Sequence, residues 1–136
     1  MTLKPIEVTT NVTIDRDTFL DTVCVINRAG GLTVTLPEAT GSGDVYRFYV
    51  KTTVTADCTI AALTTDIMQG GIAVSTDIGG TVAPCTATSD KLTMNGSTTG
   101  GLLGSYIEVK DVVDTTWLVT GVLVASGTEA TPFAAT

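Results

Sequence analysis

The stretch GGLTVTLPEATGSGDVYRFYV, residues 30–50, decides the fold, because it contains two strand-like runs separated by a turn-rich loop. In the first run Leu32, Val34 and Leu36 alternate with threonines, which is the two-residue period of a strand buried on one face. Pro37 then ends the run, since proline lacks the N–H that a sheet ladder requires. A half-buried strand followed by a loop is therefore expected here.

The second run, residues 45–50, repeats this alternation with larger side chains. Tyr46 and Phe48 fall on one face, and Arg47 and Tyr49 fall on the other. Glycines in the intervening loop supply the backbone freedom that turns need. The two runs are therefore expected to form a hairpin-type unit with one apolar face for a core.

Six further runs are typical of strands, with Asp, Asn and Gly between them. They are residues 18–27, 58–63, 70–74, 91–95, 105–113 and 115–125. No segment has the capped i, i+3, i+4, i+7 apolar spacing of a helix. The sequence therefore predicts an all-β fold, a single-domain β-sandwich or small β-barrel of about eight strands. Residues 76–104 are expected to be either long loops or strands that need a partner.

The two ends of the chain differ from the middle, because both look extended and both carry apolar side chains. The expected organisation is an N-terminal arm (residues 1–10), a β-sandwich or barrel domain (residues 11–124) and an extended C-terminal tail (residues 125–136). The alternative for the N-terminal arm is an edge strand of its own domain.

The composition favours contacts with other protein chains. The net charge is −7 and the seven cationic side chains are scattered, so direct nucleic-acid binding is not expected. No run of 18 apolar residues is present, so no membrane span is expected. The mean hydropathy is nevertheless +0.38 with only 15% charged residues, which indicates apolar surface that self-association covers.

The chain offers little for catalysis. It has no histidine, which removes the usual general base near neutral pH. Asp111 and Asp114 are expected to bracket a turn, and an acid–base pair is the alternative. Asp15, Asp17 and Asp21 fail the spacing of an EF-hand loop, and a looser calcium site is the alternative to a solvated turn. We expect no enzymatic activity, no cofactor and no bound metal.

The cysteines and the single tryptophan are expected to be structural. Cys24, Cys58 and Cys85 are odd in number and widely spaced, which indicates reduced thiols, with a disulfide between Cys58 and Cys85 as the alternative. Trp117 lies in an alternating run, where a core anchor is the expected role. A subunit interface or a ligand platform is the alternative for Trp117, since aromatic residues are enriched at both.

Two stretches, GLTVTLPEATGSGDVYRFYV (residues 31–50) and GSYIEVKDVVDTTWLVTGVLVASGTEATPF (residues 104–133), carry a resemblance to a known group. Together they resemble small structural proteins of tailed bacteriophages, often from phages of marine bacteria, that are associated with capsid decoration and are also called cement proteins. The resemblance implies a β-rich trimer without a cofactor that binds the outside of an expanded head and holds neighbouring capsomers together. It also implies synthesis in the host bacterial cytoplasm and a final location on the outer surface of the virion capsid.

The major capsid protein is then the expected partner, and the N-terminal arm is the expected docking element. An extended segment can add to an exposed sheet edge through main-chain hydrogen bonds, while alternate side chains fill pockets. The residues expected to dock on the capsid are Leu3, Pro5, Ile6 and Val8. The residues expected at the interface of a homotrimer are Tyr49, Trp117, Leu123 and Phe133.

Two other roles remain as alternatives. A receptor-binding or fibre-tip domain would also be β-rich, trimeric and rich in Thr and Gly, and sugar binding would favour this role. A tail-tube or head-closure subunit would require ring-like assembly.

Overall fold

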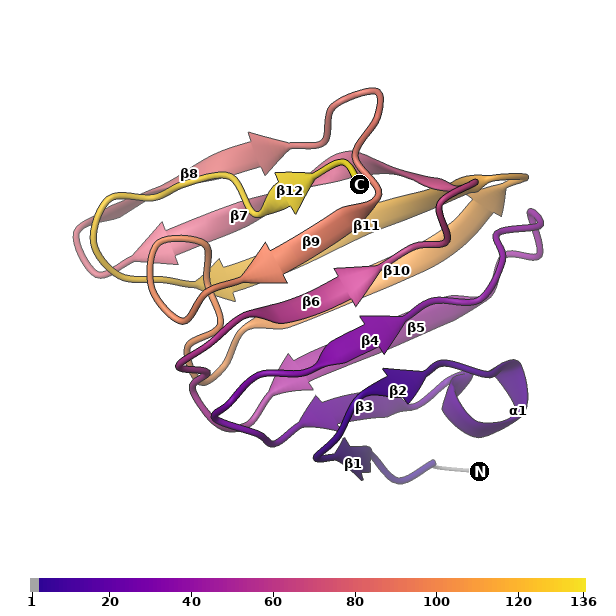
Figure 1. The fold of residues 1–136 in the computed structure, drawn as a ribbon, viewed down its shortest axis with the longest axis horizontal. Helices are drawn as coiled ribbons and strands as arrows, with labels where there is room; N and C mark the ends of the chain where they lie inside the picture. The colour runs from indigo at the N-terminus through magenta and orange to yellow at the C-terminus, as the bar shows by residue number, and fades with distance from the viewer. Residues whose placement is uncertain (1–2) are drawn as a thin grey trace.

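The computed structural model describes residues 3–136 and shows an almost entirely β protein (Figure 1). Strands account for 49% and helix for 3%, so the all-β prediction is confirmed. The strands form two open sheets stacked face to face, so a sandwich is observed and not a closed barrel. Within the described residues, no helix has the length and apolar character needed to cross a membrane.

The larger sheet has seven strands in the spatial order β1-β3-β5-β10-β11-β7-β8. Its strands are β1 (Ile6–Val8), β3 (Val23–Ile26), β5 (Val45–Val50), β7 (Ile67–Thr76), β8 (Gly79–Pro84), β10 (Tyr106–Val113) and β11 (Thr116–Val124). β10 and β11 form an antiparallel hairpin that lies between β5 and β7. A second hairpin, β7–β8, ends this sheet on the side opposite β1.

The smaller sheet has five strands in the order β12-β9-β6-β4-β2. Its strands are β2 (Val12–Thr13), β4 (Thr33–Thr35), β6 (Cys58–Ala61), β9 (Lys91–Met94) and β12 (Phe133–Ala134). β2, β4 and β6 are parallel to one another, whereas β9 and β12 continue the sheet in antiparallel fashion. Figure 1 shows this sheet stacked over the face of the larger one, with β1 and β2 at one end of the sandwich and β8 and β12 at the other.

The first half of the chain alternates between the two sheets. In the larger sheet Ile6 pairs with Cys24 and Cys24 pairs with Phe48, so successive parallel neighbours are 18 and then 24 residues apart. Parallel neighbours need a crossover connection, and here each crossover contains a strand of the opposite sheet. The hairpin expected at residues 30–50 is therefore wrong, because β4 and β5 lie in different sheets and the loop between them carries the chain across.

The core lies between the two sheets, where inward-facing side chains from both form one cluster. The alternation seen in the sequence predicts the faces correctly, since Leu32, Val34 and Leu36 are buried and so are Tyr46 and Phe48. The largest fully buried side chains are Trp117, Tyr46, Phe48, Ile14, Ile26, Leu36, Ile60, Met68, Ile72, Leu92, Met94 and Ile107. A core this continuous supports one domain across the described residues.

The N-terminal segment is the edge strand that was the alternative to a free arm. β1 pairs in parallel with β3, and Ile6 and Val8 pack against the core cluster of their own chain. Their side chains are therefore committed within the domain, which corrects the expectation that both are free to fill pockets on a capsid. Leu3 and Pro5 precede the strand and are exposed. Residues 1 and 2 of the expected arm lie outside the described residues.

The C-terminal tail is likewise tied to the domain. Phe133 in β12 pairs with Leu92 of β9 and is buried in the core. The backbone N–H and the hydroxyl of Thr136 both donate to a carboxylate oxygen of Asp90, at 2.8 and 2.9 Å. The extended tail expected at residues 125–136 therefore ends in an edge strand that closes one side of the smaller sheet.

Residues 76–104 were expected to be either long loops or strands that need a partner, and they contain two paired strands, β8 beside β7 and β9 beside β6, joined by loops. The single helical turn α1 (Arg16–Phe19), which connects β2 to β3, was not expected from the sequence. The Asp15 side chain caps this turn by accepting from the Thr18 N–H at 2.8 Å, and Phe19 anchors it to the core.

At Gly121 the backbone of β11 leaves no space for a side chain beside β10. Its φ of 140° is rarely adopted by residues with a side chain, and a Cβ at this position would lie 2.1 Å from the carbonyl oxygen of Tyr106. Only glycine therefore fits at this point of the hairpin.

Candidate functional site

A cavity of about 210 Å³ lies beside the β4–β5 connection. Its wall combines that connection with α1 and with inward-facing residues of β5, β10 and β11. The lining residues are Arg16, Pro37, Glu38, Thr40, Ser42, Asp44, Tyr46, Asp111 and Trp117. The loop that the sequence marks as turn-rich is thus one wall of a cavity.

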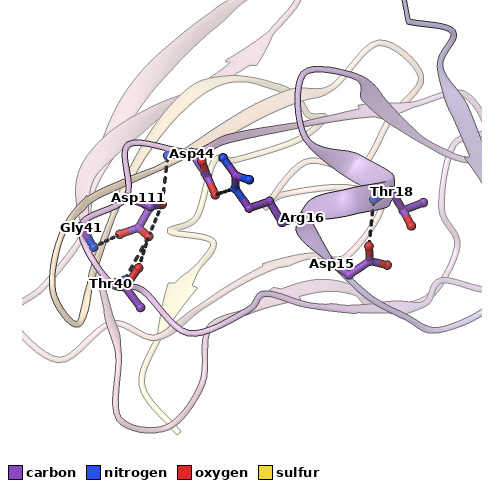
Figure 2. Close-up of polar contacts among 8 residues, drawn as sticks. Asp15, Arg16, Thr18, Thr40, Gly41, Asp44 and Asp111 are labelled. Atoms are coloured by element: carbon purple, nitrogen blue, oxygen red, sulfur yellow. Dashed lines mark hydrogen bonds and ion pairs between the residues drawn. The ribbon is translucent and has the colours of Figure 1, made fainter.

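Asp111 holds this loop in place (Figure 2). One oxygen of its carboxylate accepts from the Gly41 N–H at 2.7 Å. The other accepts from the Ser42 hydroxyl at 2.8 Å, from the Thr40 N–H at 3.0 Å and from the Thr40 hydroxyl at 3.4 Å. Backbone bonds between Asp111 and the loop (Gly43 N–H to Asp111 O, 2.8 Å; Asp111 N–H to Asp44 O, 2.9 Å) complete the attachment.

The hydrogen bonds to Asp111 decide its ionisation. Burial of this carboxyl acts to raise its pKa, but the donors from Thr40, Ser42 and Gly41 outweigh burial, so the pKa of Asp111 is lowered below its ordinary value. Asp111 is therefore a charged anchor whose acceptor sites are occupied by the loop. Asp114 is exposed at the β10–β11 turn, where its backbone forms an isolated bridge with Thr40 but its carboxylate makes no hydrogen bond to the described residues of the loop. Only Asp114 lies at the β10–β11 turn, whereas Asp111 is inside β10 and bonds the β4–β5 loop, so the expectation that the two bracket a turn is wrong for Asp111.

A second carboxylate, Asp44, positions the only guanidinium on the cavity wall. The Nε of Arg16 donates to Asp44 at 2.8 Å, and Figure 2 shows the Arg16 side chain reaching from α1 to the loop. The Arg16 side chain is largely exposed and Asp44 is largely buried. This ion pair contributes little to stability, because one partner is in water, but it fixes a cation at the cavity.

Two aromatic side chains form the inner wall. The rings of Tyr46 and Trp117 lie 6.0 Å apart between centroids and are tilted by 57°. Burial first, and the nearby Asp44 carboxylate second, raise the pKa of Tyr46, and no hydrogen bond contributes to this shift. The indole Nε1 of Trp117 is buried and has no hydrogen-bond partner within residues 3–136.

Trp117, Leu123 and Phe133 are corrections to the expected subunit interface. All three are buried in the core of a single chain, with Trp117 only 1% exposed, so they have no surface to offer a second copy. The role of core anchor that the sequence analysis expects for Trp117 is confirmed by this burial. Tyr49 differs, since it lies half-buried on the outer face of the larger sheet, as the sequence predicts.

The outer face of the larger sheet carries an uncharged row that sequence reasoning missed apart from Tyr49. Six strands contribute one residue each, in register: Val25, Tyr49, Tyr106, Val122, Ala73 and Val82. Val122 is 48% exposed and Val82 is 69% exposed. An ion pair between Arg47 and Glu108 (3.3 Å) flanks the row on the same face.

The smaller sheet presents a different outer face. Thr33, Thr59 and Thr93 face one another across β4, β6 and β9, and the hydroxyls of Thr59 and Thr93 lie 3.1 Å apart. Three threonine side chains thus line the middle of this face, and the apolar row lies on the outer face of the larger sheet. The two faces of the sandwich are therefore suited to different surroundings.

The remaining candidate residues are accounted for separately. Asp15 caps α1, and no group of three or more His, Cys, Asp or Glu side chains converges within residues 3–136. In the same range all three cysteines are free thiols, so the Cys58–Cys85 alternative does not hold in this structure. Burial raises the pKa of Cys24 to about 12 and that of Cys85 to about 11.

Comparison with known proteins adds no relative: no protein family, curated protein or solved structure matches this chain.

Proposed function

We propose that this chain is a non-enzymatic structural protein of a bacteriophage head, which binds the outer surface of the capsid and stabilises it as a decoration protein. The observation that carries this proposal is the uncharged row across six strands of the larger sheet. At about 4.8 Å between neighbouring strands, five intervals give a strip of about 24 Å. A strip of this length on a sheet face is suited to packing against another protein.

We place the protein on a phage head because its sequence resembles small head proteins of tailed phages. Two features of the chain support the proposal. The Arg47–Glu108 pair beside the row consists of opposite charges that neutralise each other. The two outer faces differ, so the face with the uncharged row is suited to protein contact and the face that carries Thr33, Thr59 and Thr93 is suited to water.

Self-association as a homotrimer is part of the proposal, with the interface placed on the row and not on the buried residues first expected there. Tyr49 remains in it, joined by Tyr106, Val122 and Val82. Repetition of such contacts over a shell gives stabilisation through multivalency even where each contact is weak. The capsid itself is the other surface that can cover the row.

The experiment that tests the proposal combines light scattering with co-sedimentation. The purified chain is expected to scatter with three times its 14.0 kDa mass, and to sediment with empty expanded heads assembled from the major capsid protein of the same genome. Val122→Lys is expected to weaken association or head binding by at least about tenfold, because it places a charge at the centre of the row.

The matched control is Val113→Lys, since Val113 is 55% exposed but lies at the β10–β11 turn, away from the row. Both variants are expected to fold, because each replaces an exposed side chain. A monomer that binds no heads contradicts the proposal. A loss of binding that is equal in both variants contradicts the placement of the interface.

A further inference from the structure

The strand β8 (Gly79–Pro84) is by far the longest of the four strands that end the two sheets. It has six residues, whereas β1 has three and β2 and β12 have two each. An edge strand exposes a row of backbone N–H and C=O groups to which another strand can pair. Among the described residues, only β8 therefore offers an edge long enough for several such bonds.

This edge lacks the features with which proteins usually block strand pairing, such as charged side chains, bulges and covering segments. Residues 78–84, IGGTVAP, contain no charge, and β8 pairs with β7 in an unbroken register. Five of its six residues are exposed, and only Ala83 is buried. The opposite edge of the same sheet differs, since β1 carries Glu7 in an ion pair with Lys51 at 3.0 Å.

The backbone groups of Gly80 and Val82 point away from the sheet. The C=O of Ser75 accepts from the Ala125 N–H at 2.8 Å, so the backbone groups of Ser75 face β11 and not β8. Gly80 is opposite Ser75 in the antiparallel β7–β8 pair, and two opposite residues either bond to each other or both face away. Gly80 therefore faces outward, and so does Val82 two residues later. No hydrogen bond from another described segment reaches the backbone of either residue.

The edge is complementary to itself. When two copies of β8 lie antiparallel about an axis at Thr81, Gly80 of each copy is opposite Val82 of the other. Each of these two pairs exchanges two N–H···O bonds, so all the outward groups of Gly80 and Val82 are satisfied. An axis at Val82 would instead place Gly80 opposite Pro84, which has no N–H to donate. The axis at Thr81 also brings Ile78, which is 93% exposed, beside Pro84 of the second copy.

We propose that β8 pairs antiparallel with β8 of a second copy of this chain, about a two-fold axis at Thr81, and so joins two larger sheets into one. The axis is perpendicular to the sheet, so the uncharged rows of the two copies face the same side. The contact does not depend on the proposed role on the capsid, and it is separate from the homotrimer interface placed on the row.

A contact of this size is weak in solution. It consists of four backbone hydrogen bonds and a small apolar area, which is typical of transient interfaces. We expect a Kd on the order of 0.1–1 mM. Copies that are held side by side on one surface would nevertheless be paired, because their effective concentration is on the order of millimolar.

Amide–water exchange measured by NMR on the whole chain tests the pairing. Between about 20 µM and about 2 mM, exchange at Gly80 and Val82 is expected to slow by about three- to sevenfold, as the stated Kd requires. Thr81 and Ala83 are the internal controls, because their N–H groups already bond to β7 and are expected to exchange equally at both concentrations. The series is repeated in Val122→Lys, which weakens association through the row and leaves β8 unchanged.

Two charged variants test the position of the axis. Thr81→Lys and Thr81→Glu each place two like charges directly opposite one another in the paired edge, so each alone is expected to abolish the concentration dependence. An equal mixture of the two variants is expected to restore it, because opposite charges then meet at the axis. Thr33→Lys is the matched control on the smaller sheet and is expected to behave like the parent. Thr81 and Thr33 are both exposed, so the variants are expected to fold.

Three results would overturn the inference. The first is exchange at Gly80 and Val82 that is the same at all concentrations up to about 2 mM, in the parent and in Val122→Lys. The second is a concentration dependence that Thr81→Lys leaves intact or that Thr33→Lys removes equally. The third is a mixture of the Lys and Glu variants that does not restore pairing. Should both Thr81 variants fail to fold, the concentration series in the parent and in Val122→Lys decides alone.

Discussion

Replacing Asp111 by asparagine tests how firmly one carboxylate holds the β4–β5 loop. The side chain is 2% exposed and accepts four hydrogen bonds, one at one oxygen and three at the other. In Asp111→Asn the amide nitrogen replaces the oxygen that accepts from Gly41, so two donors face each other, and the remaining bonds lose their charge assistance. A hydrogen bond to a charged group contributes about 1.5–3 kcal/mol. We therefore expect the free energy of unfolding to fall by about 3 kcal/mol near neutral pH.

The pH dependence of this loss has a definite sign. The pKa of Asp111 in the folded chain is lowered from its ordinary value of 3.8, which means that the charged form is favoured by folding. The stabilisation is therefore complete above pH 3.8 and is lost as the pH falls through the lower, folded pKa. The difference between the parent and Asp111→Asn is expected to be constant near neutral pH and to narrow below pH 3.8.

Urea denaturation followed by Trp117 fluorescence is the assay, at one fixed protein concentration because self-association changes apparent stability. The loss corresponds to a fall in melting temperature of about 10 °C for a chain of this size. Asp114→Asn is the control, since this exposed carboxylate has no side-chain bond to the loop and its replacement is expected to change stability by less than about 0.5 kcal/mol. Equal losses in the two variants, or a loss at Asp111 that persists undiminished at low pH, would refute the reasoning.

Three further predictions concern the scaffold. Gly121→Ala is expected to destabilise the fold by at least about 2 kcal/mol, because the new methyl meets the Tyr106 carbonyl, whereas Gly79→Ala has open space and is expected to be nearly neutral; thermal melts compare the two. Cys24, whose pKa is raised to about 12, is expected to react with a disulfide reagent at pH 8 only after denaturation, and prompt labelling of the native chain would contradict its burial. Deleting the segment that includes Ile6–Val8 is expected to lower the melting temperature, since this segment pairs with β3 and packs against the core, and an unchanged melting temperature would restore the free-arm interpretation.

Much of the fold is predictable from local alternation, and the exceptions have physical causes. The faces of the β5 side chains and the burial of Leu32, Val34 and Leu36 follow from a period of two. Which strands pair does not follow, because alternation says which face is buried and not what lies beside the strand. The expected hairpin at residues 30–50 failed for this reason, since a loop that turns within one sheet and a loop that crosses between sheets have the same glycine-rich composition.

The short edge strands were missed for a related reason. β2 and β12 are two residues long, and their extended backbone depends on the neighbour to which they bond. The four residues of α1 are too few to show helical periodicity, and only the capping position of Asp15 before Thr18 could have indicated a turn.

The candidate site was visible only in part. The sequence marks Asp111 as a candidate carboxylate, but the residues that donate hydrogen bonds to it lie about 70 residues earlier in the chain, and no spacing rule connects them to it. Arg16 and Asp44 are 28 residues apart, and the two sheets bring them together. The inward position of Tyr46 was predictable, whereas the unpaired indole of Trp117 depends on every neighbour in the packed core.

The order of the strands also governs how the chain can reach its native state. The pairing of β1 with β3 closes a loop of 18 residues, whereas the pairing of β5 with β10 places Tyr49 opposite Tyr106, 57 residues later. The longer closure costs about 1 kcal/mol more in chain entropy. The pairing of β1, β3 and β5 is therefore expected to form before the β10–β11 hairpin takes its place between β5 and β7. Until that step β5 and β7 each present an unpaired edge in the middle of a sheet, and such edges recruit other chains. Slow folding, of milliseconds to seconds, and aggregation when the chain is made rapidly are the expected signs of this late insertion.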